Sequence, residues 1–96
     1  MYVKIHSRSG RDVIAVCDED IIGKIFETKD KQLEITKEFY EGEKKNEEEV
    51  ISIIKKADNL NIVGKNSVGI ALKTNTILKS DVKMIKNIPY IYIISS

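Results

Sequence analysis

Hydrophobic residues recur with the two-residue period of a β-strand in the first part of the chain. Tyr2 to His6 alternate, with Val3 and Ile5 on one face, and Asp12 to Cys17 form a second run that is rich in β-branched residues. Ser7 to Arg11, between the runs, form a turn cluster. The pattern predicts a β-hairpin.

Weaker strand patterns follow in the next part of the chain. A second hairpin is predicted around Lys29 to Lys31, with strands over Lys24 to Thr28 and Gln32 to Thr36. Between the hairpins, Asp18 to Gly23 is expected to form a short helical turn that its first residue caps. Phe39 to Gly42 are expected in a loop or turn.

A helical period appears after residue 45. Asn46 to Ala57 carry one apolar stripe, and the first residue is a good N-cap. Glu47 to Glu49 fill the first turn and Lys55 and Lys56 the last, as the helix dipole favours. A weaker helix is predicted from about Asn66 to Thr74, where Gly69 costs about 1 kcal/mol relative to alanine.

The remaining apolar runs predict strands that complete a sheet. Leu60 to Val63 indicate a short buried strand, and Val82 to Ile85 and Tyr90 to Ile94 close the chain, with a turn over Asn87 to Pro89. Ninety-six residues suffice for one hydrophobic core. We therefore expect an α+β fold over residues 1–96, a single domain of antiparallel β-hairpins with about two α-helices packed on a mixed sheet.

Composition excludes several classes of protein. The chain has 16 basic and 15 acidic residues, so no overall charge attracts nucleic acid or a membrane surface. Fourteen of the basic residues are lysine. The chain shows neither a signal peptide nor a membrane-spanning pattern, and its single cysteine, Cys17, fits a reducing compartment. We expect a cytoplasmic protein.

No segment carries a catalytic signature. Cys17 would need a base such as His6, but the predicted hairpin places His6 near Val13 and Cys17 opposite Tyr2, so a structural cysteine is expected. One histidine and one cysteine do not make a zinc site. Asp18 to Asp20 are expected to favour a helix start. The sequence predicts no catalytic residue, metal or cofactor, and it favours a non-catalytic protein over an enzyme.

Gly64, Lys65, Asn66 and Ser67 form a candidate phosphate site. They join a predicted strand to a predicted helix, where free N–H groups, the Lys65 ammonium and the Ser67 hydroxyl could hold a phosphate. The segment has neither the glycine spacing of a P-loop nor that of a dinucleotide fingerprint. The more ordinary interpretation is a turn capped by Asn66 or Ser67.

Tyr90 and Tyr92 form a second candidate site. They lie two residues apart and share one face of the last strand, near Lys83 and Lys86, an arrangement that suits stacking on unpaired bases. The alternative is that this face packs on a helix. An apolar final strand at a sheet edge would also favour pairing with a second copy of the chain.

Several segments together resemble a known family: Met1 to His6, Val16 to Asp18, Ile22 to Lys24, Phe39 and Tyr40 with Gly42, Asn61 to Gly64 with Val68, and Ile88 to Tyr90. The chain resembles the archaeal domain of unknown function 424, a group of small proteins of about this length. The resemblance implies an archaeal, cytoplasmic origin and a compact α/β domain. It implies no established activity and brings no catalytic residues.

Three hypotheses on function follow from the sequence. The first is a non-catalytic binding module that acts on RNA or on a protein of the translation apparatus. The second is a protein–protein adaptor, or a homodimer formed through the C-terminal strand. The third is a phosphate- or nucleotide-binding protein, or an enzyme, that uses the turn from Gly64 to Ser67.

Overall fold

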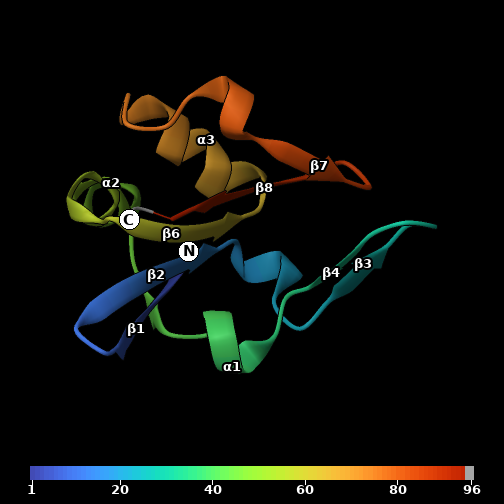
Figure 1. Cartoon of the computed structure of the whole chain (residues 1–96), viewed down its shortest axis with the longest axis horizontal. Coiled ribbons are helices and arrows are strands. Elements are labelled where there is room, and N and C mark those ends of the chain that lie inside the picture. Colours follow the sequence, from blue (N-terminus) through green and yellow to red (C-terminus); the bar gives the residue numbers. More distant parts are fainter. Residues whose placement is uncertain (95–96) are drawn as a thin grey trace.

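The computed structural model describes residues 1–94 and is built around a six-stranded sheet (Figure 1). The strand order is β5-β1-β2-β6-β8-β7, and all neighbours are antiparallel except the parallel pair β2–β6. The strands are β1 (Tyr2–Arg8), β2 (Arg11–Cys17), β5 (Glu43–Lys44), β6 (Asn59–Val63), β7 (Lys83–Ile85) and β8 (Ile88–Ile93). The predicted α+β fold with a mixed sheet is confirmed, while residues 95–96 of the predicted domain lie outside the described part.

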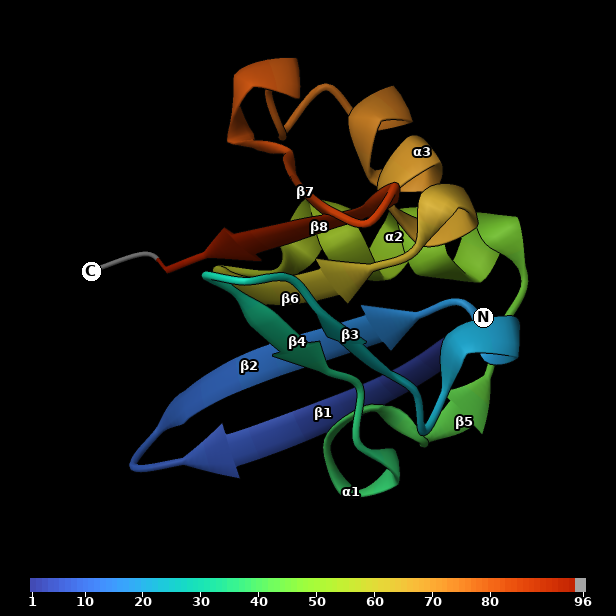
Figure 2. The same cartoon turned by 90° about the vertical axis from the view of Figure 1, so that its right-hand side faces the viewer.

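Two layers cover the sheet. Helices α2 (Glu47–Lys56) and α3 (Lys65–Lys73) lie on one face. The short helix α1 (Lys37–Tyr40) and the hairpin of β3 (Ile25–Glu27) and β4 (Gln32–Glu34) lie on the other. Figure 2 views the sheet from this second side. Within residues 1–94, none of the helices has the length and apolar character needed to span a membrane.

The first hairpin has the predicted register. Cys17 lies opposite Tyr2, and His6 lies opposite Val13. The turn consists of Ser9 and Gly10, both with positive φ, as a two-residue hairpin turn requires. The separation of the cysteine from the histidine is therefore confirmed.

Helix α2 begins where the sequence predicts. Asn46 is its N-cap, and the backbone N–H of Glu49 donates to the Asn46 side chain at 2.9 Å while the Asn46 N–H donates back to the Glu49 carboxylate at 3.1 Å. This reciprocal pair satisfies two backbone donors at the helix start. Val50 and Ile54 on the apolar stripe are buried.

Two local predictions need correction. Phe39 and Tyr40, expected in a loop or turn, belong to α1, because the Thr36 hydroxyl accepts from the Phe39 N–H and starts a helical turn. The last turn consists of Lys86 and Asn87, both with positive φ, so Pro89 lies inside β8. A single sequence gave no reason to expect two non-glycine residues in that conformation.

The final strand, β8, lies at the edge of the sheet over only part of its length. β8 pairs with β6 over Tyr90 to Ile93 and with β7 over Ile88 to Tyr90. Only its C-terminal half lacks a strand partner on the β7 side. The part of β8 that a strand of a second copy could reach is therefore that half.

Alternate residues of the central strands point into two separate cores. Val16, Ile62 and Ile91 pack under α2 and α3. Ala15 and Val63 point to the other face, where the core contains Cys17, Ile21, Leu33, Ile35, Tyr40 and Ile85. β6 and the second half of β2 are buried on both sides of the sheet.

Candidate functional site

The second core covers only part of its sheet face. Beside α1 lies a hollow of about 630 Å³, lined by His6, Arg8, Val13, Phe39 and Asn61, together with Ile5 and Ser7. A second hollow of about 290 Å³ is lined by Arg11, Val13, Asn59, Asn61, Tyr92 and Ile94, with Leu60 and Ile93. Val13 and Asn61 line both hollows, so the two adjoin. The first lies within the ~300–1,000 Å³ range of ligand sites.

Strand register brings these residues together. Asn61 lies opposite Tyr92 on β8 and beside Ala15 on β2. Because β8 runs antiparallel to β6, its C-terminal end lies at the same end of the sheet as the β1–β2 turn (Figure 2). We call this surface the open sheet face; it consists of His6, Arg8, Arg11, Val13, Phe39, Asn61 and Tyr92.

Aromatic rings cross the open sheet face and the core beside it. The His6 and Phe39 rings stack with centroids 4.4 Å apart, and the His6 Nε2 lies 2.8 Å from the Phe39 carbonyl oxygen. The Phe39 ring meets the buried Tyr40 edge-on at 4.9 Å, and Tyr90 and Tyr92 are 5.3 Å apart. Tyr92 is 47% exposed. The face thus offers an exposed ring on β8 and a half-buried stacked pair on β1 and α1.

The phenol groups at this face stay protonated at neutral pH. Burial raises the pKa of Tyr40, and the neighbouring Tyr92 raises it further. Burial and then Tyr90 raise the pKa of Tyr92. The phenol groups of Tyr40 and Tyr92 are therefore neutral hydrogen-bonding groups and not bases.

The two arginines of the chain lie at the edge of the open sheet face. Arg8 and Arg11 are opposite each other at the end of the first hairpin, and both are exposed. Neither forms an ion pair with any residue among 1–94. Because a guanidinium group binds phosphate with two parallel hydrogen bonds, this pair suits a phosphate backbone.

The structure separates the predicted set of Lys83, Lys86, Tyr90 and Tyr92. The two tyrosines share a face, as the two-residue spacing requires, and Lys83 lies opposite Tyr90. Tyr90 is half-buried against the second core. Lys86 lies in the β7–β8 turn, at the opposite end of β8 from Tyr92. Only Tyr92 belongs to the open sheet face.

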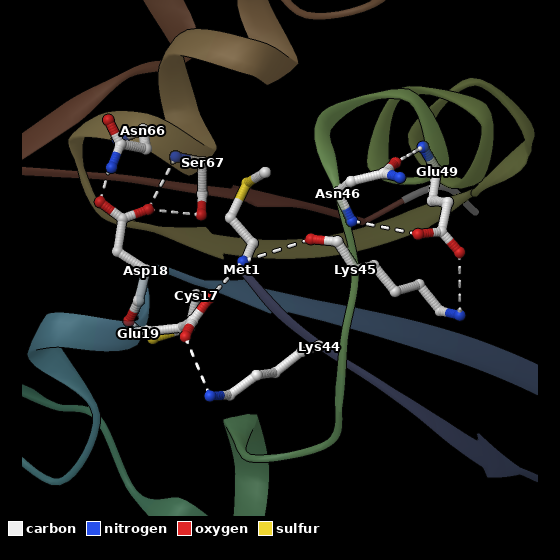
Figure 3. Close-up of polar contacts among 10 residues, drawn as sticks. All are labelled: Met1, Cys17, Asp18, Glu19, Lys44, Lys45, Asn46, Glu49, Asn66 and Ser67. Atoms are coloured by element: carbon white, nitrogen blue, oxygen red, sulfur yellow. Dashed lines mark hydrogen bonds and ion pairs between the residues drawn. The ribbon is translucent and has the colours of Figure 1, made fainter.

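The turn from Gly64 to Ser67 has an internal partner (Figure 3). The Asp18 carboxylate, only 5% exposed, accepts hydrogen bonds from the Asn66 N–H at 3.0 Å, the Ser67 N–H at 2.8 Å and the Ser67 hydroxyl at 2.6 Å. This side chain supplies the anion that a helix start favours. An added phosphate would have to displace it, whereas Lys65 remains exposed.

Asp18 therefore has a different role from the predicted one. Its side chain makes no capping bond to the 3₁₀ turn Glu19–Ile21 that follows it. Instead, it caps α3, whose own N-cap position is Gly64 with φ 113°. A β-carbon at Gly64 would lie 2.3 Å from the Asp18 Cγ, so the close approach requires glycine.

The Cys17 thiol is not activated. It is fully buried and donates to the Asp18 carbonyl oxygen at 3.0 Å. Burial raises its pKa to about 12, with further contributions from Asp18 and Asp20. A thiol that stays protonated at neutral pH is a poor nucleophile. Among residues 1–94, no cluster of three or more His, Cys, Asp and Glu side chains could hold a metal ion.

Sequence reasoning missed most of the open sheet face. The sequence pattern assigns His6 no role at a binding surface and indicates only a turn at Arg8 and Arg11. One signal was present: the two arginines of a lysine-rich chain flank the same turn. The position of Asn61 in the middle of a buried strand was a second signal, because asparagine is rare there.

A comparison with family models identifies the ancestry of the chain. Residues 6–95 match the family described as protein of unknown function DUF424. The chain belongs to this family. A search of curated proteins found no match.

One solved structure has the same fold. It is described as an uncharacterized conserved protein from Methanopyrus kandleri, and the similarity covers 99% of this chain and 92% of that one with a TM-score of 0.77. The two sequences are 19% identical. The DUF424 family member described here therefore shares a fold with that protein, and neither description states an activity.

Proposed function

We propose that this protein is a non-catalytic module that binds single-stranded RNA on the open sheet face. The observation that carries the proposal is the arrangement of Arg8, Arg11 and Tyr92 around hollows that also contain the His6–Phe39 stack. Basic groups that hold phosphates beside rings that stack on bases are typical of proteins that bind unpaired nucleic acid.

The chemistry of the face favours unpaired bases over a duplex. Aromatic rings bind a base through its flat surface, which is covered by neighbouring bases in a helix. The near-neutral net charge of +1 gives no general attraction to nucleic acid. Binding by this protein would depend on the local arginine pair. It would therefore be weak, and it would be lost when these two arginines are removed but not when basic residues elsewhere are removed.

Fluorescence anisotropy with a labelled 12-nucleotide single-stranded RNA tests the proposal. The logarithm of the association constant falls linearly with the logarithm of the salt concentration, with a slope of roughly −0.7 for each phosphate that is neutralised on a single strand. If Arg8 and Arg11 neutralise one phosphate each, they contribute about −1.4 to this slope. This contribution alone weakens binding about sevenfold between 50 and 200 mM salt. An Arg8→Ala/Arg11→Ala variant should lose it, and Tyr92→Ala should weaken binding by roughly 5- to 150-fold.

A matched control removes the same charge from the other end of the sheet. Lys83→Ala/Lys86→Ala should change the affinity much less than the arginine pair does. Equal effects from the two pairs would show that binding follows net charge and not this face. Absence of binding at 100 µM protein in low salt would reject RNA as the ligand.

A second measurement uses the protein from its native host. The chain has four tyrosines and no tryptophan, so bound nucleic acid would dominate its ultraviolet spectrum. We expect a nucleic-acid spectrum that a high-salt wash removes. A spectrum of tyrosine alone before the wash would favour a protein partner instead.

Homodimer formation through β8 has less support than RNA binding, because β7 already pairs with half of that strand.

A further inference from the structure

Asn61 occupies a position that its own fold does not explain. It lies in the middle of β6, between the buried Leu60 and Ile62, in a strand that β2 and β8 flank. Asparagine is disfavoured in strands, and a buried polar group is normally retained where it has a partner. The Asn61 side chain forms no hydrogen bond with any residue among 1–94, and it is half-buried. Its amide therefore has no hydrogen-bonding role among the described residues, and it lines both hollows, where water or a ligand can reach it.

The neighbours of Asn61 are the second core on one side and an aromatic ring on the other. Ala15, its neighbour on β2, is fully buried in that core, whereas Val13, two residues earlier on β2, lines both hollows with Asn61. Tyr92 is directly opposite on β8, and side chains in such a pair have β-carbons ~4.5–5.5 Å apart. A flat ligand that stacks on the Tyr92 ring would place its edge within reach of the amide.

We propose that Asn61 and Tyr92 form a base site that prefers adenine; this inference rests on the proposed RNA-binding function. An amide presents one donor group and one acceptor side by side. Adenine offers the matching pair on two edges, through its N6 amino group with either N7 or N1. On the edge that carries N7, guanine presents two acceptors, N7 and O6, which do not match the amide, and pyrimidines offer a smaller surface for stacking.

The two residues would divide the recognition of the base. Stacking on Tyr92 accepts any base, whereas the Asn61 amide distinguishes among them. A bidentate contact of this kind distinguishes a correct from an incorrect base by roughly 5- to 150-fold in affinity. Loss of the amide should remove the preference and leave the salt-dependent part of binding unchanged.

The test compares labelled 12-nucleotide homopolymers of adenine, uracil and cytosine in the anisotropy assay. Wild-type protein should bind oligoadenylate at least about fivefold tighter than the other two. Asn61→Val should bind all three alike, with the wild-type salt slope. Asn66→Ala, which removes an exposed amide at the start of α3, should keep the preference. Urea unfolding should show Asn61→Val to be at least as stable as the wild type, because valine suits a buried strand.

The outcomes separate the base preference from RNA binding itself. If no oligonucleotide binds, the proposed function is wrong and the preference is rejected with it. If all three bind equally, RNA binding stands and the adenine preference is overturned. A preference for another base would also overturn it. A marked loss of stability in Asn61→Val would show that the amide has a structural role, which contradicts the premise.

Discussion

Replacement of Asp18 tests how the two halves of the fold are joined. Its carboxylate receives three hydrogen bonds at the start of α3, from residues 48 and 49 positions further along the chain. An Asp18→Ala variant leaves two backbone N–H groups and the buried Ser67 hydroxyl without their acceptor. The expected result is a large loss of stability from a single side chain.

The magnitude follows from the separate contributions. Loss of an N-cap costs ~0.5–2 kcal/mol of stability. A partly buried negative charge at a helix start contributes up to ~2 kcal/mol. A buried hydroxyl group that loses its hydrogen-bond partner costs a further ~1–3 kcal/mol. Removal of a buried carboxylate offsets part of this, because its desolvation cost disappears. We expect a net loss of about 3 kcal/mol, which lowers the Tm by roughly 12–24 °C. Asp18→Asn keeps one acceptor oxygen and should lose about half as much.

Urea unfolding at pH 7 measures this loss, with Asp20→Ala as the matched control. Asp20 is exposed two residues away, and its removal should change stability by less than ~0.5 kcal/mol. The reasoning fails if Asp18→Ala and Asp20→Ala are equally mild. Sulfate adds an independent test, since it should stabilise Asp18→Ala by binding at the vacated helix start but leave the wild type unchanged. Stabilisation of the wild type by phosphate, abolished in Lys65→Ala, would instead support the phosphate-binding hypothesis.

Two further predictions concern the surroundings of this contact. Gly64→Ala should cost more than ~2 kcal/mol in urea unfolding, because φ is 113° and the new β-carbon would overlap Asp18, whereas Gly69→Ala, with open space around it, should gain about 1 kcal/mol. Equal effects at the two glycines would contradict this account. Cys17 should resist iodoacetamide at pH 8 in the folded protein and react once urea unfolds it; rapid reaction of the folded protein would show an accessible thiolate.

Local signals in the sequence were sufficient for most of the secondary structure. The first hairpin and its register followed from a two-residue period and a turn cluster, and α2 followed from its cap and charged ends. Such signals act between neighbours in the chain, so one sequence contains them in full. The two incorrect turns, at α1 and at Lys86 and Asn87, depend on a side-chain cap and on positive φ values that residue type alone does not require.

The candidate site was less accessible to sequence reasoning. Tyr92 was found because residues two apart in a strand share a face. Its association with Arg8 and Arg11 depends on the order β1-β2-β6-β8, which no local pattern specifies. Lysines close to Tyr90 in the sequence were therefore grouped with it, although one of them lies at the far end of the strand.

The sequence by itself determined which segments form strands and helices, and which side chains of each segment share a face. The tertiary structure decided which faces meet. It placed Arg11 of the first hairpin in the same hollow as Tyr92 of the last strand, and it placed the Asp18 carboxylate at the start of α3, where a phosphate was considered. The physical reason is that periodicity and capping are interactions within a few residues, whereas strand order and buried polar contacts are selected by the packing of the whole chain.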